Sequence, residues 1–130
     1  MTVTMITAGL LGLLLVFLGG YVIAGRVSFK IGLGDGGNAA MIRRMRAQAN
    51  FVEYVPMALI LIALMENATI GPHWLLVTLA AALVIARLWH AQGLISSGGT
   101  TVGRFVGSAL TMVIISVAAV ACLGRGFGAW

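Results

Sequence analysis

The sequence predicts an all-α membrane protein, a bundle of four transmembrane helices. Hydrophobic residues make up 61% of its 130 residues, against only 8 Lys and Arg and 3 Asp and Glu, which is too apolar for a soluble domain of this size. Four apolar stretches each reach the length of about 20 residues that a helix needs to cross a bilayer. No alternating pattern supports a barrel, and open strands leave backbone groups unsatisfied in lipid.

The four predicted spans lie near residues 4–25, 39–67, 72–95 and 101–124, in one domain covering residues 1–130. We expect the first span to be retained, because it lacks the basic start and small-residue cleavage site of a signal peptide. Gly25 and Arg26 are expected to end it. The third loop is short, so the last two helices should be antiparallel neighbours. Gly103 and Gly107 form a small-xxx-small pair suited to close helix contact.

The basic residues are distributed unevenly between the two ends of the spans. Five surround the first loop and two flank the third, whereas Arg125 lies at the opposite end: Arg26, Lys30, Arg43, Arg44 and Arg46, then Arg87 and Arg104. This asymmetry predicts that loops one and three are cytoplasmic and that both termini lie on the other side. Trp74 and Trp130 fit an interfacial aromatic belt. The basic residues that give the net charge of +5 are accounted for by the membrane topology and by a binding site. The expected partner is therefore the lipid bilayer and not nucleic acid.

A polar stripe interrupts the apolar pattern of the second span. One face of this helix carries Arg43, Arg46, Asn50 and Glu53, whereas Gln48 points in another direction. Glu53 lies at or close to membrane depth, where an ionisable group costs a few kcal/mol unless it is paired or solvated. We therefore expect a binding site on this stripe.

Further polar groups belong to the same half of the molecule: Tyr54, Arg87, His90 and Arg104. Arginine forks bind carboxylates and a lone carboxylate can bind an ammonium, so the set matches a small zwitterionic ligand with more acidic than amino groups. His90 is either a hydrogen-bonded structural group or part of the site. Arg26 either reaches lipid phosphates or extends over the site. If Gln48 and Glu53 contact one ligand, they must come from different subunits.

The residue inventory points away from metal and hydrolytic chemistry. Two His on opposite membrane sides, one Cys and no acidic cluster do not build a metal site, and no triad or carboxylate pair is visible. If the protein is an enzyme, we therefore expect an arginine to be the catalytic residue, which would stabilise a thiolate. Arg104 has no acidic residue within a turn, so its charge is available to an anion or to a neighbouring helix.

The motif of the second span, Arg46-Ala47-Gln48-x-Asn50-x-x-Glu53-Tyr54-x-Pro56, is similar to the signature of the MAPEG family, the membrane-associated proteins in eicosanoid and glutathione metabolism. The likeness covers all four spans, through Val22-Ile23-x-x-Arg26-x-x-Phe29 and Ala86-Arg87-Leu88-x-x-x-Gln92-Gly93. We expect a bacterial-type member, located in the inner membrane.

The resemblance implies a homotrimer that binds glutathione, as co-substrate, between subunits near the cytoplasmic face. Arg104 would be the catalytic arginine that stabilises the thiolate, and Gln48 would come from the neighbouring subunit. Leu94 stands where mammalian members usually carry a ligand-contacting tyrosine. The matching positions expected to bind glutathione are Arg26, Arg46, Gln48, Asn50, Glu53, Tyr54, Arg87 and His90.

Three functions compete on this sequence. The first is a membrane-bound glutathione-dependent transferase or peroxidase that acts on hydrophobic electrophiles. The second is a non-catalytic lipid- or glutathione-binding scaffold of the same fold, since one mammalian branch of the family binds lipids without being an enzyme. The third is a small transporter, which the near absence of charge in the outer half of the spans disfavours.

Overall fold

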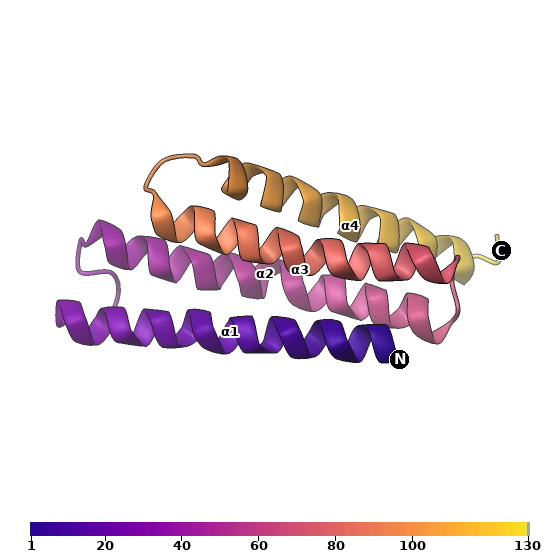
Figure 1. The fold of residues 1–130 in the computed structure, drawn as a ribbon, viewed down its shortest axis with the longest axis horizontal. Coiled ribbons are helices and arrows are strands. Elements are labelled where there is room, and N and C mark those ends of the chain that lie inside the picture. The colour runs from indigo at the N-terminus through magenta and orange to yellow at the C-terminus, as the bar shows by residue number, and fades with distance from the viewer. Residues whose placement is uncertain (130) are drawn as a thin grey trace.

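The chain folds into four antiparallel helices (Figure 1), in a computed structural model that describes residues 1–129. The helices are α1 (Thr2–Phe29), α2 (Ala39–Asn67), α3 (His73–Ser96) and α4 (Val102–Gly126). Each is long and apolar enough to cross a membrane, and residues 1–129 contain no strand. The prediction of an all-α bundle of four membrane helices is confirmed.

The two central helices of the bundle are α2 and α3. Both α1 and α4 pack against α2 and α3, and within residues 1–129 α1 makes no contact with α4. The N-terminus, the end of α4 and loop 68–72 lie at one end of the bundle, and loops 30–38 and 97–101 lie at the other (Figure 1). The polar half of α2 and the start of α4 therefore share one end of the molecule.

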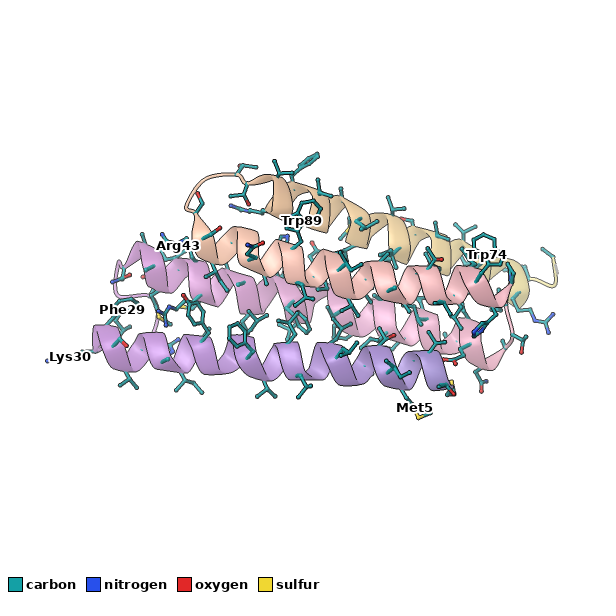
Figure 2. All side chains as sticks on the ribbon, viewed as in Figure 1. Met5, Phe29, Lys30, Arg43, Trp74 and Trp89 are labelled. Atoms are coloured by element: carbon teal, nitrogen blue, oxygen red, sulfur yellow. The ribbon has the colours of Figure 1, made fainter. Side chains whose placement is uncertain are left out.

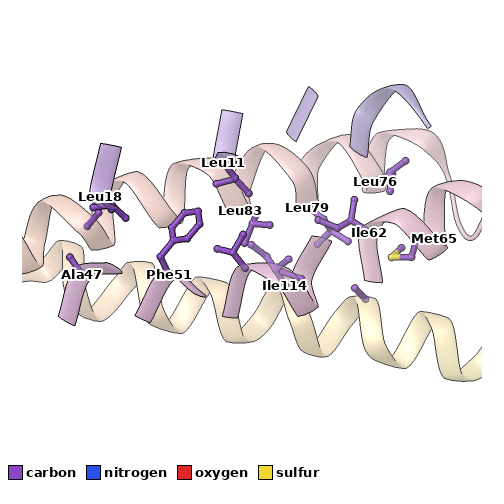
Figure 3. Packing of buried hydrophobic residues seen from close by; sticks show 14 of the residues in the cluster. Leu11, Leu18, Ala47, Phe51, Ile62, Met65, Leu76, Leu79, Leu83 and Ile114 are labelled. Carbon is purple, nitrogen blue, oxygen red and sulfur yellow. The ribbon is translucent and has the colours of Figure 1, made fainter. Parts of the chain in front are cut away.

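The core follows the helical period of α2. Its buried side chains recur at steps of three or four residues, as in Ala47, Phe51, Val55, Ala58 and Ile62. Figure 3 shows this face packed against leucines of α1 and α3 and an isoleucine of α4. Lipid tails are as apolar as these side chains, so association of the helices depends on close packing and on polar contacts between them.

Two glycines of α4 allow this helix to lie close to α3. A Cβ at Gly103 would lie 2.6 Å from Cδ1 of Trp89, and a Cβ at Gly107 would lie 2.6 Å from the Ala86 carbonyl oxygen. No side chain fits at these distances, so both positions require glycine. The small-xxx-small pair is thus a helix contact between α4 and α3, as its spacing predicted.

The first helix does not end where the sequence suggested. The expected end at Gly25 and Arg26 is wrong, because α1 continues to Phe29. A Cβ at Gly25 would lie 2.8 Å from Cδ of Arg44, so this glycine permits close approach of α2 and is not a stop signal. Lys30 closes the helix instead, in a left-handed conformation with φ of 55°, and donates its N–H to the Val27 carbonyl.

A carboxylate of α2 caps α1. The Glu66 side chain accepts hydrogen bonds from the backbone N–H groups of Val3, at 2.9 Å, and Thr4, at 2.7 Å. These N–H groups belong to the first turn of α1, and the N–H groups of a first turn have no acceptor within their own helix. Trp74 lies at the same end of the bundle and is 68% exposed (Figure 2), whereas Trp130 lies outside the described residues.

We predict that Gly107→Ala destabilises the bundle by about 1–3 kcal/mol, the usual cost of overpacking a tight contact. The added methyl group would also meet Cβ of His90 at 2.7 Å. Thermal unfolding in detergent, followed by circular dichroism, measures the effect. Gly20→Ala is the control, because a Cβ at Gly20 meets nothing within 4 Å. Equal melting temperatures for both variants would contradict the packing argument.

Candidate functional site

A buried arginine joins three helices inside the bundle. Arg87 of α3 is 1% exposed, and its Nη2 donates to Oδ1 of Asn50 on α2 at 2.6 Å. Its Nη1 lies 3.4 Å from Oγ1 of Thr111 on α4, to which it donates a long hydrogen bond. The Thr111 hydroxyl in turn donates to the Gly107 carbonyl at 2.7 Å. A guanidinium in lipid needs such partners, since an unpaired charge there costs several kcal/mol.

A histidine one turn further along α3 holds the beginning of α4. His90 is 2% exposed, and its Nδ1 lies 2.9 Å from the Arg104 carbonyl oxygen and 3.1 Å from Oγ of Ser108. A carbonyl oxygen can only accept, so Nδ1 carries the proton in this contact. Of the two interpretations of His90 from the sequence, its hydrogen bonds and burial favour the structural one.

Arg104 has a fixed backbone and a side chain without a partner. Its N–H donates to Oγ1 of Thr101, the N-cap of α4, at 3.2 Å, and its carbonyl oxygen contacts His90. Within residues 1–129 its half-buried guanidinium donates no hydrogen bond and joins no ion pair. This is the geometry of a cation held in position and available to an anion.

The outer face of α2 carries two exposed charges. Arg46 and Glu53 are exposed, lie two turns apart, and are separated by about 10 Å along the helix axis. In the described chain neither takes part in a hydrogen bond or an ion pair. Glu53 lies midway along α2, which is long and apolar enough to span a membrane. Asn50, half-buried and one turn before Glu53, connects this face to Arg87.

The opposite side of α2 is fastened to α1. The Arg44 guanidinium lies 3.9 Å from the ring centroid of Tyr21 and 5.4 Å from that of Phe29, and its Nη1 donates to the Tyr21 carbonyl at 2.8 Å. A Cβ at Gly19 would lie 3.7 Å from Nε2 of Gln48. Gln48 and Glu53 therefore face different sides of α2, as the helical period predicted.

The Arg26 side chain forms a hydrogen bond with loop 30–38. Its Nη1 donates to the Gly34 carbonyl oxygen at 3.1 Å, and its side chain is half-exposed. The same loop leads into α2, whose N-cap Asn38 accepts from the N–H groups of Ala40 and Met41. Arg26 thus ties the end of α1 to the loop that begins α2, a contact that neither alternative from the sequence included.

The nine predicted site residues fall into separate groups in one chain. Asn50, Arg87, His90 and the backbone of Arg104 form an inner network, and Tyr54 is half-buried. Arg46 and Glu53 lie on the outer face of α2, whereas Gln48 and Arg26 lie toward α1 and its loop. Direct ligand contact by Arg87 and His90 stays a prediction, and their burial favours a positioning role.

Two hydroxyl groups of the inner network were not anticipated. Thr111 and Ser108 belong to α4, for which the sequence offered only Arg104 and the glycine pair. The available signal was the spacing, because Thr111 follows Gly107 by four residues and so continues the stripe that faces α3. Among residues 1–129, no three His, Cys, Asp or Glu side chains are grouped so as to hold a metal ion.

Comparison with known proteins identifies the fold family. Residues 4–124 match the sequence model of the MAPEG family, which is nearly the whole chain. The chain belongs to the MAPEG family. The resemblance indicated by the motifs of α1, α2 and α3 is therefore confirmed, and the match also includes nearly all of α4.

Two curated proteins are similar to this MAPEG chain. Both are described as inner membrane protein YecN, one from Escherichia coli (strain K12) and the other from an Escherichia coli O6:H1 strain. Each is 31% identical over 68 residues, which is 52% of this chain and 51% of the relative. The chain thus spans about half the length of the curated relatives it matches.

We predict that Asn50→Leu destabilises the bundle by about 1.5–3 kcal/mol, because it removes a hydrogen bond to a buried charge. The double variant Asn50→Leu with Arg87→Met should be more stable than the sum of the single effects, since it also removes the charge. Thermal unfolding of the four proteins in detergent gives the coupling energy. Asn67→Leu, at the exposed end of α2, is the control. Strictly additive effects would show that the Asn50 to Arg87 bond is unimportant.

Proposed function

We propose that this MAPEG chain is a membrane-bound glutathione-dependent transferase or peroxidase acting on hydrophobic electrophiles. One observation carries the proposal: Arg46 and Glu53 expose opposite charges on the membrane-spanning helix α2, and no residue of the described chain pairs with either. Glu53 lies midway along α2, where an unpaired charge in a membrane costs several kcal/mol, so a partner from outside the chain would stabilise it. Glutathione, with carboxylates, an ammonium and a thiol, supplies both kinds of partner.

The binding roles follow from charge and position. Glu53 holds the ammonium group and Arg46 a carboxylate, the latter through a planar fork that matches carboxylate geometry. Asn50 and Tyr54, both half-buried beside this face, provide hydrogen bonds. Arg87 orients the Asn50 amide, because its 2.6 Å bond to Oδ1 leaves the amide nitrogen free to donate.

The proposed reaction begins with the glutathione thiol losing its proton to water. The Arg104 guanidinium stabilises the resulting thiolate, whose sulfur attacks an electrophilic carbon while the leaving group departs with the bonding electrons. With a lipid hydroperoxide, the sulfur attacks the terminal oxygen, the O–O bond breaks, and the lipid alkoxide leaves and takes a proton from water to become the alcohol. A second glutathione then converts the sulfenic acid to the disulfide and water. The apolar substrate comes from the bilayer around the helices.

We also propose that the site forms between the subunits of a homotrimer. Gln48 lies on the α1 side of α2 and Glu53 on the exposed side, so one chain cannot direct both at the same ligand. A neighbouring subunit that supplies Gln48 would complete the site and cover the exposed charges of α2. The site and the assembly then depend on the same residues.

The proposed location is the inner membrane, with loops 30–38 and 97–101 in the cytoplasm. Arg26, Lys30, Arg43, Arg44 and Arg46 all lie on or near loop 30–38, and positive charge favours the cytoplasmic side. The curated relatives, described as inner membrane proteins, support this location.

A non-catalytic scaffold that binds glutathione or lipid is the second candidate. It is favoured by Leu94, which is 5% exposed and packs in the core where mammalian enzymes of the family carry a ligand-contacting tyrosine. A leucine offers no hydrogen bond to a ligand. The two candidates share the binding face of α2 and differ in whether Arg104 activates the thiol.

We predict that glutathione added to the detergent-solubilised protein at neutral pH produces the ultraviolet absorbance of a thiolate. Arg104→Ala should abolish this band and slow conjugation roughly 100-fold, as expected when one charge-stabilising donor is lost. Arg125→Ala, the same change at the other end of α4, is the matched control. A band that persists in Arg104→Ala would exclude Arg104 as the activating group. Glutathione binding without any band would favour the scaffold.

We predict that Glu53→Gln weakens glutathione binding by about 1–3 kcal/mol, because the ammonium group loses its counter-charge. Isothermal titration calorimetry measures the change. Glu66→Gln is the control, since Glu66 lies at the far end of α2 and caps α1.

Mixed oligomers of Glu53→Gln and Gln48→Ala subunits test whether the site is shared. If each site takes Gln48 from one subunit and Glu53 from the next, random mixing in equal amounts should restore about a quarter of the tight sites. Restoration would require both variants in one oligomer. No recovery in oligomers shown by native mass spectrometry to be mixed would contradict a shared site.

A further inference from the structure

A second, purely apolar site lies on the opposite half of the bundle. A groove of about 440 Å³ runs between α1 and α3, from Val3 to Leu10 on one side and from Val77 to Ile85 on the other. Small side chains, including those of Ala80 and Ala81, line it together with larger ones such as Ile6, 60% exposed, and Ile85, 58% exposed. The small alanine side chains of α3 thus leave room between α1 and α3.

The groove offers no free polar group to an occupant. Thr7 is the only lining residue with a polar side chain, and its hydroxyl donates to the Val3 carbonyl of its own helix at 2.7 Å. No charged residue lines the groove. A ligand that fits it must therefore be a hydrocarbon segment, bound by dispersion contacts and shape.

The length of the groove distinguishes a lipid chain from a partner helix. Eight residues of helix extend about 12 Å, less than half of the hydrocarbon core of about 30 Å. The groove is therefore confined to one leaflet, the one beside loop 68–72. A transmembrane helix of another copy crosses both leaflets and would extend well beyond the groove. A single acyl chain from one leaflet matches the observed extent.

The mouth of the groove carries an interfacial anchor. Trp74 precedes Val77 by one turn of α3, is 68% exposed, and lies at the loop 68–72 end of the bundle (Figure 2). In the described chain its indole N–H donates to no atom. Tryptophan at this depth places its ring among the acyl chains and its N–H at the headgroups.

From this geometry we infer that the α1–α3 groove binds one acyl chain of a phospholipid in the leaflet of loop 68–72, with the headgroup beside Trp74. The groove ends at Ile85, two residues before Arg87, and it shares no lining residue with the inner network or with the proposed glutathione site. It is therefore independent of the glutathione proposal, and a lipid bound there remains in place whether or not the protein is an enzyme.

Photolabelling in vesicles tests the inference. The full chain is reconstituted in phosphatidylcholine that carries a diazirine on one acyl chain, irradiated, and mapped by mass spectrometry of its peptides. The probe has no net charge, so basic residues do not select it. We expect label on residues 3–10 and 77–85 to exceed several-fold that on the exposed face of α4 around Val120. Ala81→Phe should reduce groove labelling several-fold.

Two further variants control for the effect of an added side chain and for misfolding. Val120→Phe adds a ring to an exposed position of α4 in the same leaflet and should leave groove labelling unchanged. Ala81→Leu fills the groove less severely and replaces Ala81→Phe if circular dichroism shows that the latter fails to fold. Uniform labelling of all lipid-facing helices would overturn the inference. So would labelling that the filling variants do not reduce.

A cysteine cross-link separates lipid from a second copy of the chain. Ile6→Cys in a Cys122→Ser background places one thiol on the rim of the groove. If a second copy covers the groove, the lipid label should be absent, and a two-fold arrangement that brings the two introduced thiols together should also give disulfide-linked dimers in high yield. That result would overturn the acyl-chain assignment. Label in the groove without dimers supports it.

Discussion

The structure depends first on one buried cation. In a bilayer the hydrophobic effect does not press helices together, so specific polar contacts and close packing must do so. Arg87 makes its hydrogen bonds to Asn50 and Thr111, and these bonds fix α2 and α4 against α3. The alternative arrangement, a guanidinium without partners in hydrocarbon, costs several kcal/mol. Gly107, which brings α4 close enough for Thr111 to reach Arg87, serves the same contact.

The helix α1 is held by different means from α4. Its ends are fastened to α2, by the Glu66 carboxylate at one end and by the Arg44 guanidinium between Tyr21 and Phe29 at the other. Between these two attachments α1 packs through apolar side chains and leaves the groove against α3. Buried hydrogen bonds therefore join α2, α3 and α4 to one another. The helix α1 makes its polar contacts with α2 only near its own two ends.

Much of this fold could be predicted from the sequence, because hydropathy and length define membrane helices without knowledge of their partners. The helical period also predicted that Gln48 and Glu53 lie on different faces of α2. The spacing of Gly103 and Gly107 predicted a close contact between α4 and another helix. The partners of Arg87 could not be predicted, since they depend on how far each helix is shifted along its neighbour. Gly25 was misread for a similar reason: a glycine that ends a helix and one that admits a neighbour look alike in sequence.

Asn50 connects the buried network to the face of α2 that we propose binds glutathione. Its Oδ1 holds Arg87, whereas the rest of its half-buried amide lies one turn from Glu53 on the outer face of α2. The inner network continues through His90, one turn beyond Arg87 on the same helix, to the backbone of Arg104. The buried bonds therefore set the positions of the groups that face outward, and leave their charges unpaired. Arg46, Glu53 and Arg104 have no ion-pair partner within residues 1–129, and the proposed glutathione ligand would supply opposite charges to all three.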